Sequence, residues 1–270
     1  MKKYSSAEPV SLRELDIVPG VLGRIARERS AAYRQGAPLS KSNPEPLEWR
    51  GFGEALKAPG LSVIAEVKRA SPSGGLIADI DPLQTAQSYF AGGASALSVL
   101  TEPKYFGGSL EHVRTISSQV PLPILRKDFT VHPSQLTEAV EAGATAALLI
   151  VAILGDRTKS YVAAGSALGL DLLVEVHDRK ELQIAIESGA EIIGVNNRDL
   201  SNLQINLETA PMLLTEARNL GYTGLLVAES GYRTRIDLEP ISDLADAVLI
   251  GSSLAASKDP KVAVEALVDH

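Results

Sequence analysis

Residues 141–151 read EAGATAALLIV and contain both signals from which the fold can be inferred. Gly143 stands where a helical segment must end, and glycine adopts the left-handed backbone conformation of a helix end at little cost. A continuous apolar run follows at once, which is typical of a parallel strand buried on both faces. The same junction recurs at AGGASAL (residues 91–97) and ESGAEII (residues 187–193), so we expect Gly93, Gly143 and Gly189 to end three helices.

Apolar runs of this kind recur from residue 61 onward and alternate with segments of helical periodicity. We expect strands at residues 61–68, 94–100, 122–127, 145–151, 171–176, 191–196, 225–229 and 246–251. Eight βα units predict a closed barrel, because closure removes both edge strands. The chain length of 270 residues also suits such a barrel, which typically takes about 250. The sequence therefore predicts an α/β protein with a single (β/α)8 TIM barrel over residues 61–270.

Residues 1–60 precede the first expected strand and predict an N-terminal helical extension. We expect helices at residues 21–34 and 47–57, joined by a link that contains three prolines, Pro38, Pro44 and Pro46. A segment of this size is small for an independent core. We therefore expect the extension to pack over one end of the barrel.

The composition excludes several classes of function. The chain has 26 Lys+Arg against 33 Asp+Glu, a net charge of −7, and no basic run, which argues against binding nucleic acid or an anionic membrane. The longest apolar run, Ala146–Leu154, is far shorter than the about 20 residues that cross a bilayer, and no apolar segment of a signal peptide follows the first residues. Cysteine is absent and the four histidines lack metal-ligand spacing. We expect a cytoplasmic protein without a metal site.

Charged side chains end several of the expected strands. In TIM barrels the chemistry lies at the carboxyl ends of the strands, and side chains of alternate residues share one face. On the faces that we expect to point inward stand Glu66, Lys68, Lys127, Glu175, Asn196, Arg198 and Glu229. Burying such groups is costly unless they pair or act chemically, so the alternatives are a catalytic site and an ion-pair network that only fills the barrel. His177 shares the parity of Glu175, but we expect it to serve in a loop or a helix cap.

The loops after the first, seventh and eighth strands are rich in glycine and serine. They read SPSGG (residues 71–75), SG (230–231) and GSS (251–253). Glycine lets backbone N–H groups approach a phosphate, and serine adds hydroxyl donors. Each loop alone is compatible with a plain helix cap, but the last two occupy the usual phosphate position of a TIM barrel. We therefore expect a phosphorylated small molecule as the ligand.

Together these motifs resemble the indole-3-glycerol phosphate synthase family over about residues 61–257. The resemblance is carried by IAEVK (64–68) with SPS (71–73), SVLTE (98–102) through FGGS (106–109), LRKDF (125–129), LLI (148–150), LVEV (173–176), GVNNRDL (194–200), VAESG (227–231) and LIGS (249–252).

The resemblance implies a cofactor-free carbon–carbon lyase of tryptophan biosynthesis. Its substrate, 1-(2-carboxyphenylamino)-1-deoxyribulose 5-phosphate, would undergo ring closure, decarboxylation and dehydration to indole-3-glycerol phosphate. By analogy with the family, Lys127 is the general acid for ring closure and Lys68 pairs with the anthranilate carboxylate. Glu175 is the base or proton relay, positioned by Glu66 and Asn196.

The resemblance also implies the contacts that hold the substrate. Phosphate contacts would come from Ser73, Ser230, Gly231, Gly251 and Ser252. The apolar pocket for the aromatic ring would be formed by Phe106, Phe129, Leu149, Leu200 and Leu249. Arg198 and Glu229 would belong to the charge network around the substrate, and no contact is assigned to residues 1–60.

Three other functions are compatible with a phosphate-binding barrel. A phosphoribosylanthranilate isomerase is disfavoured because it expects a cysteine as general base at the end of the first strand, and this chain has no cysteine. A Schiff-base aldolase would use Lys127 or Lys68, and borohydride would trap its imine. A catalytically silent phosphosugar-binding barrel would need neither Lys127 nor Glu175. No motif indicates an oligomer, so we favour a monomer.

Overall fold

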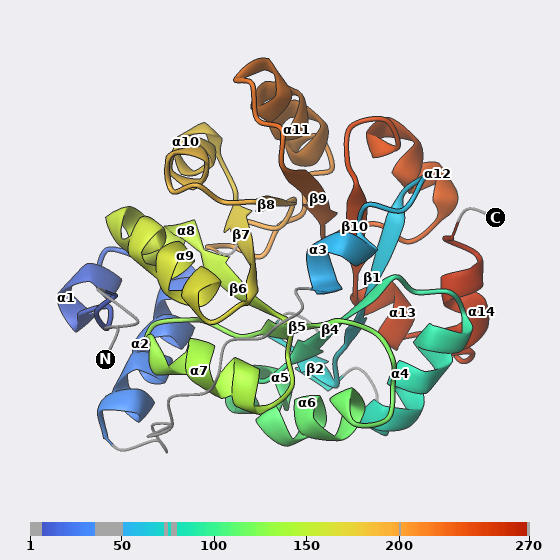
Figure 1. Ribbon diagram of the computed structural model, residues 1–270, viewed down its shortest axis with the longest axis horizontal. Coiled ribbons are helices and arrows are strands. Elements are labelled where there is room, and N and C mark those ends of the chain that lie inside the picture. Colours follow the sequence, from blue (N-terminus) through green and yellow to red (C-terminus); the bar gives the residue numbers. More distant parts are fainter. Residues whose placement is uncertain (1–6, 36–50, 73–74, 77–79, 200, 269–270) are drawn as a thin grey trace.

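The computed structural model describes residues 7–35, 51–72, 75–76, 80–199 and 201–268 (Figure 1). Eight parallel strands form a closed barrel in the order β1-β10-β9-β8-β7-β6-β5-β4, and β4 pairs back onto β1. The barrel strands are β1 (Ser62–Val67), β4 (Ala96–Leu100), β5 (Ile124–Lys127), β6 (Ala146–Ile150), β7 (Asp171–Val176), β8 (Ile192–Asn196), β9 (Leu225–Glu229) and β10 (Ala247–Ile250). Each strand lies within one of the apolar runs, so the predicted TIM barrel is confirmed.

Helices surround the barrel and connect consecutive strands (Figure 1). The longer connecting helices are α4 (Pro82–Ala91), α6 (Leu110–Ser117), α7 (Ser134–Glu141), α9 (Thr158–Ala167), α10 (Arg179–Glu187) and α11 (Thr209–Asn219), and α14 (Pro260–Glu265) follows the last strand. Shorter elements are α5 (Pro103–Phe106), α8 (Val151–Leu154), α12 (Arg235–Leu238), α13 (Ser252–Ala255), the 3₁₀ helices η1 (Gly155–Arg157) and η2 (Glu239–Ile241), and the hairpin of β2 (Ala70–Ser71) and β3 (Gly75–Leu76). No helix in the described part of the chain combines the length and hydrophobicity needed to cross a bilayer.

The helix-to-strand junctions explain why the chain turns back into the barrel at regular intervals. Gly93, Gly143 and Gly189 have φ angles of 91°, 86° and 79°, as expected for glycine helix ends. At Gly143 an added Cβ would also lie 2.5 Å from Oγ of Ser117, so a side chain is excluded there by space as well as by φ. The strands that follow are almost wholly buried, because one face fills the barrel and the other packs under the helices.

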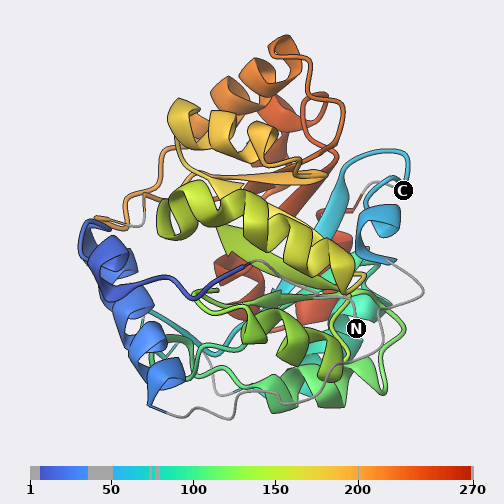
Figure 2. The same cartoon turned by 60° about the vertical axis from the view of Figure 1, so that its left-hand side comes forward.

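The N-terminal extension consists of α1 (Leu12–Leu15), α2 (Gly20–Arg34) and α3 (Gly51–Ala55). The helix predicted at residues 21–34 is confirmed, whereas residues 47–50 of the second predicted helix lie outside the described residues. Figure 2 shows α2 and α3 on opposite sides of the barrel. In α3 the backbone N–H of Gly53 donates to Oδ2 of Asp171, at the start of β7 (2.9 Å), whereas α2 reaches the carboxyl ends of the strands. The expectation that the extension covers one end is therefore wrong, since its helices cover both.

A buried ion network joins α2 to β5. Asp128, directly after β5, accepts hydrogen bonds from Arg29 of α2 (2.7 Å) and from Arg126 of β5 (3.0 Å). Tyr33 of α2 donates its hydroxyl to Glu138 of α7 (2.6 Å), which also pairs with Arg126 (3.2 Å). Because strand side chains alternate, Arg126 and Asp128 point away from the barrel interior while the residue between them points into it. The network therefore holds α2 against the strand that carries Lys127.

Candidate active site

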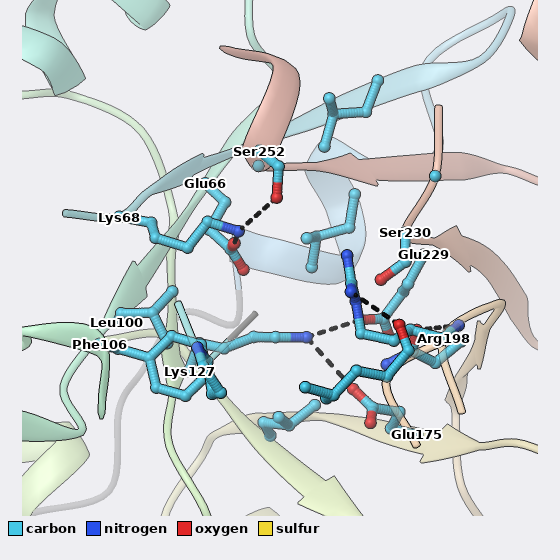
Figure 3. A pocket seen from close by; sticks show the side chains of 18 of the residues that line it. Glu66, Lys68, Leu100, Phe106, Lys127, Glu175, Arg198, Glu229, Ser230 and Ser252 are labelled. Carbon is cyan, nitrogen blue, oxygen red and sulfur yellow. Dashed lines mark hydrogen bonds and ion pairs between the residues drawn. The ribbon is translucent and has the colours of Figure 1, made fainter. Parts of the chain in front are cut away.

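A cavity lies at the carboxyl ends of the barrel strands, where all eight of them contribute to its lining (Figure 3). The contributing strand residues include Glu66, Leu100, Lys127, Leu148, Ile150, Glu175, Asn196, Glu229, Leu249 and Ile250. Closure of the barrel brings these residues together, although they lie between positions 66 and 250 of the sequence.

Lys127 extends across the cavity between two buried glutamates (Figure 3). Its Nζ lies 2.6 Å from Oε2 of Glu229 on β9 and 3.2 Å from Oε2 of Glu175 on β7. Burial by itself lowers the pKa of Lys127, but the two carboxylates raise it well above the usual lysine range. The side chain is therefore an ammonium held in a poorly hydrated place, where its positive charge acts strongly on a bound substrate.

The two glutamates differ in their protonation. Burial raises the pKa of Glu229 to about 7, against the lowering effect of Lys127. Burial also disfavours the charge on Glu175, but Lys127 and His177 together lower the pKa of this carboxyl below its ordinary value. Glu175 is thus a permanent carboxylate at neutral pH, whereas Glu229 can carry a proton. Such a difference between neighbouring carboxyls separates a proton acceptor from a group that can return a proton.

Lys68 forms a second, separate ion pair on the opposite side of the cavity (Figure 3). Its Nζ lies 2.7 Å from Oε1 of Glu66 and donates to Oγ of Ser252 at 3.1 Å. Gly251 leaves the room for this pair, since a Cβ at that position would lie 2.2 Å from Oε1 of Glu66 and 2.9 Å from Nζ of Lys68. Lys68 is therefore connected directly to the loop after the eighth strand.

Asn196 and Arg198 continue β8 into the rim of the cavity. Oδ1 of Asn196 accepts the backbone N–H of Arg198 (2.9 Å), which fixes the orientation of the amide. The guanidinium of Arg198 donates to the carbonyl of Leu203 at 3.2 Å, and burial lowers its pKa. Both residues line the cavity, with Arg198 drawn beside Glu175 and Glu229 in Figure 3.

The loops after β9 and β10 lie side by side, as expected for an anion site. Ser230 and Gly231 have positive φ angles of 68° and 98°, and α13 begins immediately after Gly251. Oγ of Ser253 donates to the carbonyl of Tyr232 (3.1 Å), which joins the two loops. Of the predicted phosphate contacts the structure brings Ser230, Gly231, Gly251 and Ser252 to the cavity, whereas Ser73 lies outside the described residues.

The other side of the cavity is apolar. Phe106 and Phe129 face each other with ring centroids 5.9 Å apart, and both line the cavity together with Leu249. The prediction that Leu149 lines the pocket is wrong. Its neighbours Leu148 and Ile150 line the cavity instead, and because side chains alternate along a strand, Leu149 points toward the surrounding helices. Leu200 lies outside the described residues.

Sequence reasoning missed several residues around the cavity. Val21, Leu22 and Ile25 of α2 line it, although no contact had been assigned to the extension. Their spacing of one helical turn was the available signal. His177 was expected in a loop or helix cap, yet its Nε2 lies 3.3 Å from Oε1 of Glu175. The parity that it shares with Glu175 was the signal for this contact.

The family profile and the sequence relatives agree on one family, and a solved structure shares the fold. A profile of the indole-3-glycerol phosphate synthase family matches residues 22–267. The indole-3-glycerol phosphate synthase of Deinococcus radiodurans is 51% identical over 262 residues, covering 94% of this chain and 97% of its own. The enzyme of the same name from Leptospira interrogans is 45% identical over 220 residues, covering 80% and 86%. A thiamine phosphate pyrophosphorylase structure from Pyrococcus furiosus, 15% identical, shares the fold with a TM-score of 0.57 over 77% of this chain and 93% of its own.

Proposed function

The chain belongs to the indole-3-glycerol phosphate synthase family, carboxy-lyases of tryptophan biosynthesis, and on this premise we propose which of its residues carry out each step of the reaction. The substrate is 1-(2-carboxyphenylamino)-1-deoxyribulose 5-phosphate. Its ribulose carbonyl is attacked by the aromatic ring, carbon dioxide leaves, and loss of water then forms the indole.

Lys127 is the general acid of ring closure. The carbonyl oxygen gains negative charge as the new carbon–carbon bond forms, and an ammonium at the mouth can donate the proton that neutralises it. The position of Nζ between Glu229 (2.6 Å) and Glu175 (3.2 Å) supports this role, because either carboxyl can take part in restoring the proton. Glu229 therefore serves the charge network of Lys127.

Lys68 binds the carboxylate of the anthranilate ring and donates a proton when water leaves. Its ion pair with Glu66 at 2.7 Å supports the first role, since it holds the ammonium at the wall of the cavity, where a substrate carboxylate can reach it. Glu175 accepts the proton released during dehydration, and Asn196 with Glu66 positions the base and the ribulose hydroxyls. Arg198 contributes positive charge at the rim.

The substrate then lies with its phosphate against the loops after β9 and β10 and its aromatic ring against Phe106 and Phe129. Ser230, Gly231, Gly251 and Ser252 hold the phosphate, and Ser73 and Leu200 stay predicted contacts of the phosphate and the ring. Decarboxylation follows ring closure because it restores the aromatic system. We further propose that the protein is a monomer. We also propose that it acts in the cytoplasm, because a chain without cysteine needs no oxidising compartment.

The observation that carries the proposal is Lys127 held between two buried carboxylates, with an apolar wall on one side and glycine-serine loops on the other. The test is an indole fluorescence assay with the named substrate. Lys127→Ala should abolish turnover while substrate affinity stays within about tenfold, about 1.4 kcal/mol. Lys57→Ala is the matched control, because Lys57 is 57% exposed, lies just after α3 and forms an exposed ion pair with Glu54.

Each other outcome points to a different function. Turnover by Lys127→Ala at the rate of the control would refute the general-acid assignment. Tight binding without turnover by the wild-type protein would indicate a silent phosphosugar-binding barrel. Covalent trapping by borohydride with a keto-sugar phosphate would indicate a Schiff-base aldolase.

A further inference from the structure

A chain of three side chains leads from the cavity toward the surface behind Glu175. Nε2 of His177 lies 3.3 Å from Oε1 of Glu175, and Nδ1 of His177 lies 2.9 Å from Oε2 of Glu181. The side chain of Glu175 is 2% exposed, whereas those of His177 and Glu181 are about equally exposed, at 15% and 16%. The imidazole thus bridges an active-site carboxylate and a carboxylate near solvent.

The local backbone determines where His177 points. His177 follows β7 and shares the parity of Glu175, so both side chains lie on the same face. Asp178 is the N-cap of α10 and accepts the backbone N–H of Glu181 (2.8 Å). The carboxylate of Glu181 in turn accepts the backbone N–H of His177 (2.8 Å) as well as contacting its ring. The start of α10 therefore orients the imidazole without any contribution from a substrate.

The two oxygens of Glu175 face different partners. Oε2 faces Lys127 in the cavity, whereas Oε1 faces His177 behind it. Oε1 is buried and forms no hydrogen bond with any described residue, so its contact with the imidazole is an ion pair. His177 is not among the described residues that line the cavity, which separates it from the groups that touch a substrate.

The charges around the imidazole favour its protonated form. Burial lowers the pKa of His177, but Glu175 on β7 and Glu181 on α10 raise it to about 10. The charged groups beyond Glu175 are Lys127 on β5 and, next to it, Glu229 on β9. At neutral pH Glu175 thus lies between two cations, one in the cavity and one behind it.

We propose that His177 is a positioning residue for Glu175: clamped by Glu181, its imidazolium holds the carboxylate so that Oε2 faces Lys127 and the reacting atoms. This inference rests on the proposed role of Glu175 as the base. Without the imidazolium, Glu175 has one charged partner instead of two, so it turns more freely and takes up a proton at higher pH.

The test replaces the imidazole and follows kcat and KM for the named substrate from pH 3 to pH 9, a range that reaches below the ordinary pKa of a glutamate. His177→Phe keeps a ring and removes both nitrogens. We expect kcat to fall about tenfold, less than the roughly 10²–10⁴-fold contributed by a general acid or base itself, with KM changed less than about threefold. The acidic limb of the kcat profile should move up by about one pH unit, since Glu175 loses a neighbouring positive charge.

Two more variants separate charge from orientation. His177→Gln retains a neutral donor and should recover part of kcat, but the acidic limb should stay shifted. Glu181→Gln should shift the limb in the same direction by less, because it weakens the hold on the imidazolium without removing it. His112→Phe on α6 is the control for loss of a partly buried histidine and should leave the profile unchanged.

A double-mutant cycle distinguishes failure of this inference from failure of the proposed base. Adding His177→Phe to Glu175→Gln should have no further effect on kcat if His177 acts through Glu175. Full activity of Glu175→Gln would refute the base itself. The positioning role alone would be overturned if Glu175→Gln is inactive but His177→Phe has a normal kcat. The same conclusion would follow if His177→Phe lowers kcat without shifting the pH profile.

Discussion

Gly194→Ala is the substitution for which the structure makes the sharpest prediction. Gly194 lies on β8, and a Cβ there would come 2.2 Å from Oε1 of Glu229 and 3.1 Å from Cδ1 of Leu173. A carbon–oxygen separation of this size is well inside van der Waals contact, so the Glu229 carboxylate must move. Its other oxygen lies 2.6 Å from Nζ of Lys127, so the movement disturbs the closer of the two lysine contacts.

The magnitude follows from two effects. Adding a methyl group to a well-packed interior costs about 1–3 kcal/mol. Loss of a charge-assisted hydrogen bond costs about 1.5–3 kcal/mol, although the two effects share one side chain and do not add in full. We expect the free energy of unfolding to fall by roughly 2–4 kcal/mol. Turnover should fall at least about tenfold, which is 1.36 kcal/mol in the activation free energy.

Urea unfolding and the indole fluorescence assay measure the two quantities. Gly53→Ala in α3 is the matched control, because it adds the same methyl group where the nearest atom lies at an ordinary 3.5 Å. It should be neutral or stabilise by about 0.4–1 kcal/mol. Wild-type stability and turnover in Gly194→Ala would show that Glu229 is not held against the β8 backbone. Lost stability with normal turnover would show that Lys127 does not need the Glu229 carboxylate.

Two further predictions concern stability. The pKa of His177 is raised to about 10 in the folded protein, so its stabilising effect is fully present below about pH 6.5 and is lost as the pH rises toward 10. The difference in unfolding free energy between the wild type and His177→Phe should therefore decrease by about 1.4 kcal/mol for each pH unit between pH 6.5 and pH 10. A difference that does not vary with pH would contradict the ion pair of His177 in the folded protein. Asp128→Ala leaves Arg126 and Arg29 without their shared buried carboxylate, and urea unfolding should show a loss of about 3–5 kcal/mol. Glu111→Ala, which removes an exposed pair with Arg114, should change stability little, and an equal loss in both variants would refute the importance of the α2 network.

Strand parity predicted much of the candidate site. The alternation of inward and outward side chains placed Glu66, Lys127, Glu175 and Glu229 on the cavity side, and the structure brings these four together. Leu149 was assigned to the pocket by the family resemblance and not by alternation, and it does not line the cavity. Alternation could not have corrected this, because β6 is apolar and buried on both faces and its sequence does not distinguish them. A strand whose alternate residues differ in polarity reveals its inward face, whereas a uniformly apolar strand does not.

The sequence by itself determined the features that depend on neighbouring residues. Glycine helix ends, apolar runs and side-chain alternation follow from backbone geometry over a few positions, and these predicted eight strands and the barrel. Only the tertiary structure decided which distant groups meet: Lys127 with Glu229, His177 with Glu175, and α2 and α3 at opposite ends. The physical reason is that backbone periodicity orients a side chain relative to its own strand. Distances between strands depend on barrel closure, and the extension is placed by buried contacts, such as that of Arg29 with Asp128, that no local pattern encodes.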